Sequence, residues 1–480
     1  MTSGNRSDLE RAARRVLDGA PGPCHRAVML DLGGLTERIT DGTVDTVVVA
    51  FPDMQGRPVG KRVTGAFFLD HVLEHGIEAC DYLLAVDVDM EPLDGYRFTN
   101  WETGYGDVVA KPDLSTLRLL PWLEGSAMVV CDVVDGDGAP VEVSPRRVLG
   151  RQIERARALG LDIRCATELE FYLFNETFEE AAAKRWRDLH PHVSTIEDYQ
   201  LLQTARQEHV LRRVRNEMLA AGIPVESSKG EAGRGQHEVN VTYGRALEVA
   251  DRHLVLKNGV KEIADQCGRA ATFMAKWSMA EVGSSCHIHA SVWDADSGAS
   301  LMAGDDAPSA LSEVGRQFVA GLIDSARQLT WLWAPYVNSY KRYVPGSWAP
   351  TAAVWGVDNR TCGFRLVGHG ESRRVECRIP GADVNPYLAL AGILAAGLWG
   401  VEQGLALPPP FEGNAYRATD VARVPTTLVE AIAELESSPV AAHAFGDDVH
   451  HHLLNTARQE WVRANQTVTD WELGRNFERI

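Results

Sequence analysis

Two acidic residues stand two positions apart in a β-rich segment, residues 168–174 (ELEFYLF). In a strand, Glu168 and Glu170 would point to the same face, because side chains alternate between the two faces of a strand. Tyr172 and Phe174 continue that face, which indicates a buried strand, although a solvated Glu-x-Glu face is the ordinary alternative. Two buried carboxylates need cations to balance their charges.

Three later segments show the same alternation of a polar with an apolar face: residues 236–241 (QHEVNV), 286–291 (CHIHAS) and 374–378 (RVECR). Taken singly, each is explained by a satisfied core histidine, a surface ion pair or a polar edge. Together, the four segments predict a sheet whose concave side forms a charged cavity. The polar residues assigned to this cavity are Glu168, Glu170, Glu231, Glu238, Asn240, His287, His289, Ser291, Arg374, Glu376 and Arg378.

The predicted cavity combines oxygen ligands with basic side chains. Its carboxylates and histidines, without a cysteine, suit Mg²⁺ or Mn²⁺ better than a closed zinc site. Arginines offer planar forks for phosphate and carboxylate groups, so the combination predicts phosphoryl transfer. The chain has no P-loop pattern and no G-x-G-x-x-G after a strand, so metals and arginines must hold the nucleotide. The arginines concerned are Arg342, Arg360, Arg365, Arg374 and Arg378.

The composition excludes several other classes of protein. Among 480 residues, 66 acidic side chains against 48 basic ones give a net charge of −18, which disfavours a nucleic-acid partner. The eight cysteines are spread singly, which indicates reduced thiols and a cytoplasmic location. We expect no secretion and no membrane insertion, because the N-terminus has no apolar signal core and the longest uncharged run, residues 384–401, contains Asn385-Pro386 and is typical of a buried helix.

The elements that position these residues fall into two groups. Residues 44–63 predict a hairpin with Asp53 near its tip, and with a second β-rich stretch at 115–143 they predict a small α+β domain over residues 1–143. A helix opening at Ser144-Pro145 and ending at Gly160 begins a large α/β or α+β domain, residues 144–480. Its expected strands lie near 163–174, 236–243, 284–293, 351–355, 361–367 and 373–379. Its expected helices lie near 206–221, 246–269, 309–333, 386–403 and 440–464. Residues 178–205 are expected to form an exposed excursion.

Over nearly its whole length, the chain resembles the bacterial type I glutamine synthetase family. The matching stretches are 168–174 (ELEFYLF), 235–241 (GQHEVNV), 257–277 (KNGVKEIADQCGRAATFMAKW), 283–293 (GSSCHIHASVW), 338–350 (NSYKRYVPGSWAP), 358–367 (DNRTCGFRLV) and 373–397 (RRVECRIPGADVNPYLALAGILAAG). This resemblance implies an α+β fold with a small N-terminal β-grasp domain, followed by a large catalytic domain with a curved antiparallel sheet.

The resemblance also implies a role for each polar residue of the site. Two or three Mg²⁺ or Mn²⁺ ions and ATP are expected, with one ion on Glu170, Glu231 and Glu238 and another on Glu168, His287 and Glu376. Asp53 is expected to enter a neighbouring subunit's site to bind and deprotonate the amine, so the active sites would form between the subunits of a double-ring dodecamer. The nucleotide group is Glu226, His289, Ser291, Arg365 and Arg374; the group for glutamate and the transferred phosphoryl is Arg342, Arg360 and Arg378, with Gly283 against the glutamate.

Three positions depart from the pattern of the ammonia-using members. Trp348 stands where the family's flap carries a glutamate that helps to bind ammonium, Val282 replaces a usual asparagine, and Lys229 lies in place of a histidine-rich approach to Glu231. An indole removes the ammonium site and offers an apolar or cation–π wall to an alkylamine. These departures resemble the γ-glutamylamine ligase branch.

The expected activity is therefore ATP-dependent ligation of the glutamate γ-carboxylate to a primary amine through γ-glutamyl phosphate. Polyamines, putrescine and small alkylamines such as ethanolamine all remain open as the amine. The alternatives are a glutamine synthetase that uses ammonia and, from another class, a catalytically silent structural or regulatory homologue. Such a silent homologue would be marked by lost metal ligands, and no expected ligand is missing from the sequence.

Overall fold

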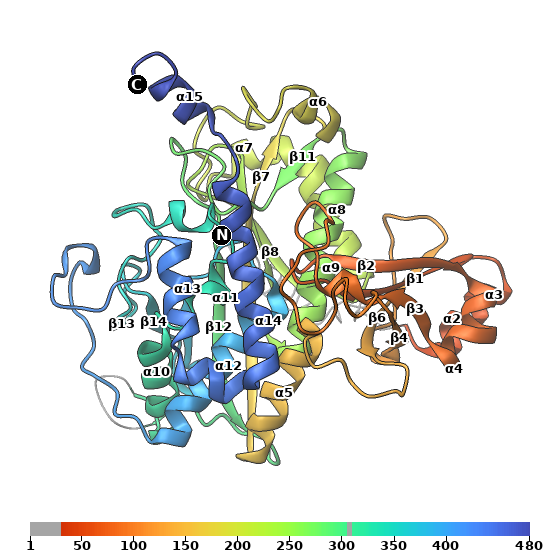
Figure 1. Ribbon diagram of the computed structural model, residues 1–480, viewed down its shortest axis with the longest axis horizontal. Helices are drawn as coiled ribbons and strands as arrows, with labels where there is room; N and C mark the ends of the chain where they lie inside the picture. Colours follow the sequence, from red (N-terminus) through yellow and green to blue (C-terminus); the bar gives the residue numbers. More distant parts are fainter. Residues whose placement is uncertain (1–29, 305–309) are drawn as a thin grey trace, which may run out of the picture.

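The computed structural model describes residues 30–304 and 310–480, which form two sheets with helices around them (Figure 1). The first sheet has the order β2-β1-β6-β4-β3, with β5 paired to β6. Its central strands β1 and β6 run parallel, and its other pairs are antiparallel. The bounds are β1 Thr46–Pro52, β2 Pro58–Thr64, β3 Ile77–Cys80, β4 Asp107–Pro112, β5 Arg118–Leu119 and β6 Ser126–Val134, with α2 Leu32–Thr40, α3 Gly65–Phe67 and α4 Leu73–His75 beside them.

The β1–β2 hairpin carries Asp53 at its turn, as the sequence predicts. The Asp53 carboxylate accepts hydrogen bonds from the backbone amides of Gln55 and Arg57, which hold the turn closed. Gly56 is in the left-handed region (φ 73°), and a Cβ there would lie 2.8 Å from Cα of Asn385, so both the backbone angle and the close approach require glycine. The turn therefore packs against Asn385 and Pro386, where a helix of the large C-terminal part begins.

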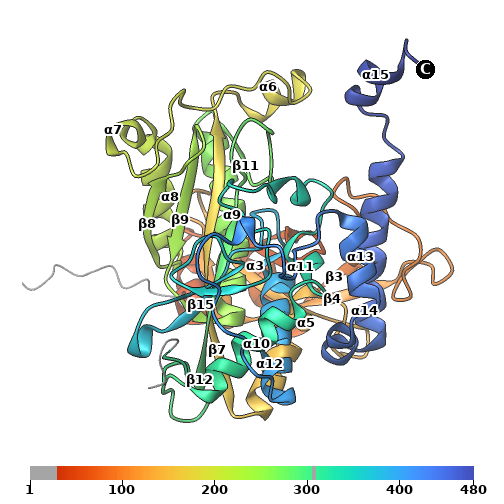
Figure 2. The same ribbon diagram turned by 90° about the vertical axis from the view of Figure 1, so that its left-hand side faces the viewer.

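The second sheet has the order β13-β14-β15-β12-β7-β9-β8, with β10 and β11 also paired to β7. The 14-residue strand β7 runs almost the full height of the molecule in Figure 2, beside β9 and β8. All pairs are antiparallel except β13 with β14, so the expected antiparallel catalytic sheet and the α+β class are confirmed. The bounds are β7 Leu161–Phe174, β8 Val225–Gly230, β9 Gln236–Val241, β10 Gly244–Arg245, β11 Ala270–Thr272, β12 Cys286–Asp294, β13 Trp355–Val357, β14 Phe364–Val367 and β15 Arg374–Cys377.

The buried helix α12 (Pro386–Gln403) forms the centre of the helical layer. Asn385 caps its first turn, Pro386 takes the position where no backbone donor is needed, and Gly404 ends it in the left-handed region. Nearly every side chain of α12 is buried, so the uncharged run is a core helix. The other helices are α5 Pro145–Ala158, α6 Phe178–Ala183, α7 Leu201–Thr204, α8 Glu208–Ala220, α9 Ala246–Gln266, α10 Glu313–Ser325, α11 Thr330–Trp333, α13 Leu428–Glu436, α14 Pro439–Asn465 and α15 Asp470–Asn476.

Several predicted boundaries were wrong in detail. The helix expected near 309–333 is two helices, α10 and α11, and the part of that prediction on residue 309 lies outside the described residues. The strand expected at 351–355 begins only at Trp355, five residues after Pro350. Ser144 does precede α5, but its hydroxyl is buried without a hydrogen-bond partner instead of capping the helix.

The division at residues 143/144 stays a prediction. The first sheet ends at Val134 and the second begins at Leu161, on either side of that point. However, one hydrophobic core continues through both parts and includes Val49, Val148 and Leu390. The expected excursion at 178–205 contains two short helices and exposed side chains such as Trp186 and Leu201.

Candidate active site

One group of carboxylates comes from neighbouring strands of the second sheet. Glu170 on β7 and Glu238 on β9 are paired in register, and Glu231 follows the end of β8. One carboxylate oxygen of each lies within 4.8 Å of the others. The three residues expected to share one metal are therefore brought together, while their role as ligands stays a prediction.

This group is largely buried, and its carboxylates outnumber the cations beside them. Glu170 accepts hydrogen bonds from Gln236 Nε2 (3.0 Å) and the backbone amide of Ser285 (2.8 Å). Burial and the charge of Glu231 nevertheless raise the pKa of Glu170 above its ordinary value. Burial and the charge of Glu168 likewise raise the pKa of Glu238. Lys229 Nζ contacts Glu231 and lies 4.0 Å from Glu238, but one ammonium does not balance three carboxylates. The group thus keeps an excess of negative charge, which a divalent cation would balance.

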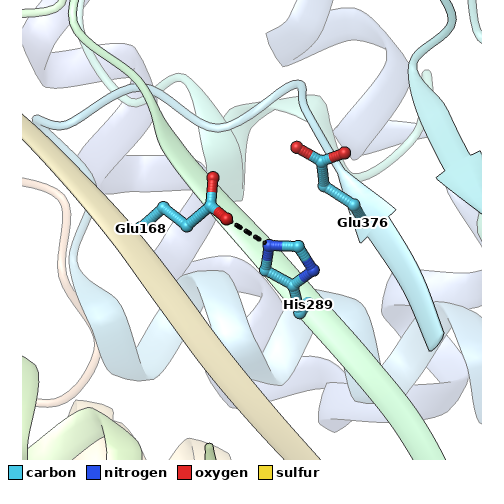
Figure 3. A group of neighbouring side chains, drawn as sticks. All are labelled: Glu168, His289 and Glu376. Atoms are coloured by element: carbon cyan, nitrogen blue, oxygen red, sulfur yellow. Dashed lines mark hydrogen bonds and ion pairs between the residues drawn. The ribbon is translucent and has the colours of Figure 1, made fainter. Parts of the chain in front are cut away.

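A second group surrounds Glu168, the neighbour of Glu170 on the same face of β7. Glu168, His289 and Glu376 converge from β7, β12 and β15 (Figure 3), with His289 Nε2 at 2.8 Å from Glu168 Oε1. His287 Nδ1 lies 3.2 Å from Glu168 Oε2 and 3.5 Å from Glu376 Oε1. The expected set of Glu168, His287 and Glu376 is therefore assembled, and His289, expected on the phosphates, stands within the same group.

Positive neighbours keep the carboxylates of the second group charged. Burial raises the pKa of Glu168, but hydrogen bonds from His287 and His289 outweigh it and bring the pKa below its ordinary value. Burial also raises the pKa of Glu376, yet the charges of His287 and Arg378 outweigh it and lower the pKa to about 2. Arg374 Nε donates to His289 Nδ1 (3.2 Å), so Nε2 of this imidazole carries the proton that faces Glu168.

The donor chemistry of both groups fits a hard divalent cation. The donors are carboxylate oxygens and imidazole nitrogens, with no thiolate. On β9, Asn240 is the register partner of Glu168, and its Oδ1 is buried without any hydrogen-bond partner. An orphaned carbonyl oxygen beside clustered carboxylates is a further acceptor that only a cation, water or ligand can satisfy. This residue was assigned to the cavity from its position in the strand alone.

Four of the five predicted arginines, Arg342, Arg360, Arg365 and Arg378, line one cavity together with Glu170, Glu231 and Trp348. Arg378 Nη1 and Arg365 Nη1 donate to Glu376 (2.6 and 3.0 Å), and Arg378 Nε is buried without a partner. Arg342 is buried and donates to the backbone carbonyls of residues 378 and 379, so it is tied to the backbone after β15. Arg360 is exposed on the cavity wall.

A second cavity meets the first at Glu168 and Asn240. Four of the five residues expected to contact the nucleotide line it: Glu226, His289, Ser291 and Arg374. Arg365, the fifth, lines the first cavity instead.

Trp293 and Arg164 also line this second cavity, and sequence reasoning missed both. Arg164 lies 3.7 Å from the centroid of the Trp293 ring, and Trp293 Nε1 donates to Ser291 Oγ (2.8 Å). A flat arginine–indole pair of this kind can stack with a nucleobase. Trp293 follows His289 and Ser291 at two-residue spacing, so the alternation of β12 held the signal.

The flap residue Trp348 stands at the mouth of the first cavity. Its side chain is 59% exposed and its backbone is in the left-handed region (φ 66°), which is rare for a bulky residue. Arg378 Nη2 donates to its carbonyl (3.4 Å). At the inner wall, a Cβ on Gly283 would lie 2.6 Å from Cγ of Arg342, so glycine is needed where the backbone approaches this arginine.

Comparison with known proteins identifies the family. Residues 142–476 match the model of the glutamine synthetase catalytic domain. This chain belongs to the glutamine synthetase family. It is 53% identical to the γ-glutamylethanolamide synthetase GlnA4 of Streptomyces coelicolor (92% of this chain, 94% of the relative) and 39% identical to a glutamate–isopropylamine ligase of Pseudomonas sp. (91% and 96%). The solved structure of a GmaS/ADP complex superimposes with a TM-score of 0.80 at 28% identity, covering 94% of this chain and all of that one.

As a member of the glutamine synthetase family, the protein is a ligase that uses ATP and divalent metal ions. The two groups of carboxylates and histidines are the metal-binding candidates. None of the helices within residues 30–304 and 310–480 has the length and apolar character that a bilayer crossing requires. The seven described cysteines are all free.

Asp53 lies apart from the glutamine synthetase site of its own chain. It lines neither of the two cavities, its side chain is fully buried, and Arg57 Nε donates to its Oδ2 (2.7 Å). Burial raises the pKa of Asp53, and the charge of Arg57 only partly offsets this. Its expected role in a neighbouring subunit's site stays a prediction.

If Glu170, Glu231 and Glu238 bind a metal ion, Mn²⁺ should stabilise the protein through Glu238. At a hundredfold excess over the dissociation constant, binding contributes about 2.7 kcal/mol, which for a chain of this size raises Tm by roughly 2–3 °C. Glu238→Gln keeps the shape but removes the charge, so its Mn²⁺-dependent shift should be markedly smaller by differential scanning calorimetry. Glu434→Gln, at a surface carboxylate paired with Arg327, is the matched control and should keep the full shift. Equal shifts in Glu238→Gln and wild type would rule out this ligand.

Proposed function

We propose that this protein joins the γ-carboxylate of glutamate to a small primary amine at the expense of ATP. The main support for this proposal is the position of Trp348. Its exposed indole lies at the mouth of the cavity that all six expected metal ligands line. The names of the two relatives, an ethanolamide synthetase and an isopropylamine ligase, support an amine with an organic tail. The ADP bound in the GmaS complex supports ATP as the second substrate.

The reaction needs two steps, because a carboxylate at neutral pH is a poor acyl donor. First, a γ-carboxylate oxygen bonds to the γ-phosphorus of ATP as the bond to the ADP oxygen breaks, which gives γ-glutamyl phosphate. The amine nitrogen then bonds to the acyl carbon, inorganic phosphate leaves, and the nitrogen loses a proton. When bound, divalent ions on the two groups would neutralise the charge of the phosphates.

The side chains of this chain have distinct parts in that scheme. Arg378, whose Nε is buried and unpartnered, faces the position where an anionic substrate must lie. Arg342 fixes the backbone after β15, and Arg360 lies on the exposed wall where glutamate would enter. The second cavity would hold the nucleotide, with the base against Trp293 and the phosphates toward Arg374 and His289.

Two alternatives are weaker. Ammonia as the substrate would leave the flap without the carboxylate that binds ammonium. A catalytically silent homologue would have no reason to keep two complete groups of buried carboxylates, whose mutual repulsion destabilises the fold. Both alternatives therefore disagree with a feature of the site.

We also propose that the active sites form between subunits of a double-ring dodecamer in the cytoplasm. Asp53 is separated from the metal-binding candidates of its own chain, yet its turn matches the family pattern for the residue that binds and deprotonates the amine. A neighbouring subunit would bring it into reach. The free cysteines agree with a reducing compartment.

The activity is tested by phosphate release from ATP and glutamate with a panel of amines that includes ammonium. Ethanolamine and short alkylamines should support release, and mass spectrometry should find the corresponding γ-glutamylamide. Release with ammonium alone would instead favour glutamine synthesis. No release with any amine, in a folded protein that binds ATP, would favour the silent homologue.

Trp348→Glu should shift the preference from alkylamines toward ammonium. The new carboxylate adds a charge-assisted hydrogen bond to ammonium worth roughly 1.5–3 kcal/mol, or about 10–100-fold in kcat/KM. Loss of the indole removes contact with the alkyl tail in the same direction. Trp101→Glu, at another exposed indole that does not line the cavity, is the control. An unchanged ratio of kcat/KM for the alkylamine over ammonium would mean that Trp348 only packs the flap.

Subunit sharing predicts complementation between two inactive variants. Asp53→Asn and Glu238→Gln should each abolish turnover alone. When the two are co-expressed, random mixing should restore about a quarter of the sites, each combining intact halves of two subunits. Activity that stays at the level of the single variants in a verified mixed oligomer would show that each chain uses its own Asp53.

A further inference from the structure

The mouth of the first cavity is framed by two exposed aromatic side chains. Trp348 lies on one segment of the rim and Tyr199, which is 72% exposed, on another. Both have a positive φ, 66° for Trp348 and 56° for Tyr199. Because a positive φ is unfavourable for a bulky residue, the surrounding structure must hold the backbone at both positions. An incoming amine passes between side chains with apolar faces.

A fixed positive charge lies directly behind this rim. Lys229 projects from the edge strand β8, where it is the register partner of Glu238, and its side chain is only 21% exposed. Its Nζ contacts the carboxylate of Glu231 and lies 4.0 Å from Glu238. The same Nζ lies 4.6 Å from the centroid of the Tyr199 ring. Lys229 therefore lies over one face of the Tyr199 ring, and both residues line the cavity.

This arrangement has a different consequence for each kind of amine. Every substrate must bring one amino group to the acyl carbon, but a diamine brings a second ammonium on its tail. That ammonium would seek an aromatic face or a carboxylate. One face of the Tyr199 ring already holds Lys229, whose Nζ lies 4.6 Å from the ring centroid. A like charge at this distance opposes the second ammonium.

On the basis of the proposed function, we infer that Lys229 makes this site select monoamines with an uncharged tail over diamines. The uncharged tail packs against Trp348 and Tyr199, and the lysine excludes a tail that ends in a cation. The inferred substrate class is thus narrower than primary amines in general. Lys229 is a specificity-determining residue: it contacts Glu231 but is not itself one of the expected ligands of metal or phosphate.

The test compares n-butylamine with 1,4-diaminobutane, which differ only by the terminal ammonium. Wild type should favour butylamine in kcat/KM, and Lys229→Met should reduce that preference by about tenfold or more, since it removes the repulsion and frees the face of the Tyr199 ring. Lys229→Gln should behave like Lys229→Met, whereas Lys229→Arg should keep the wild-type preference. Because Lys229 contacts Glu231, each variant is measured at its own saturating Mn²⁺ concentration.

Lys184→Met is the matched control, because Lys184 pairs with Glu176 outside the cavity and should leave the preference unchanged. A wild type that uses both amines equally overturns the inference, as does a preference that is the same in Lys229→Met, Lys229→Gln and wild type. Failure of the proposed function is distinct from both results, because then wild type would release no phosphate with butylamine itself.

Discussion

Repulsion between buried carboxylates is the constraint on which the rest of this structure depends. Glu168, Glu170 and Glu238 lie on neighbouring strands of one sheet face, and the strand register holds their backbones side by side, so their carboxylates lie close together. The negative charge is balanced differently in the two groups of carboxylates. Imidazoles and arginines balance Glu168 and Glu376 within the chain, whereas Glu170, Glu231 and Glu238 keep a deficit that suits a divalent ion.

The strand β7 shows why so much of the site was predictable from the sequence. Two-residue alternation is a local property, so the shared face of Glu168 and Glu170 follows from the residues alone. The same logic placed Glu238 and Glu376 correctly on their strands. The confirmed helix α12 is equally local, because its cap, its first-turn proline and its terminal glycine all lie within the segment.

What could not be predicted depends on contacts between distant segments. β8 has the sequence VESSKG, with little apolar pattern, and exists as an edge strand only because β9 pairs with it. The junction of the two cavities at Asn240 requires the register of three strands. The seating of Lys229 over Tyr199 joins an edge strand to an irregular excursion, and no periodicity in the sequence encodes such a contact.

Asn385 illustrates how a residue with no part in the chemistry becomes irreplaceable. Its Oδ1 accepts from the amide of Tyr387 to start α12, while its Nδ2 donates to the carbonyls of Asp53 and Met54. Only an amide side chain supplies an acceptor and two donors at that size. An isosteric aspartate would repel both carbonyls. A leucine would remove the hydrogen bond to the first turn of α12 and both hydrogen bonds to the β1–β2 turn. In a genetic screen for lost activity, substitutions of Asn385 would therefore be found as often as substitutions of the carboxylates, although Asn385 contacts no reacting atom.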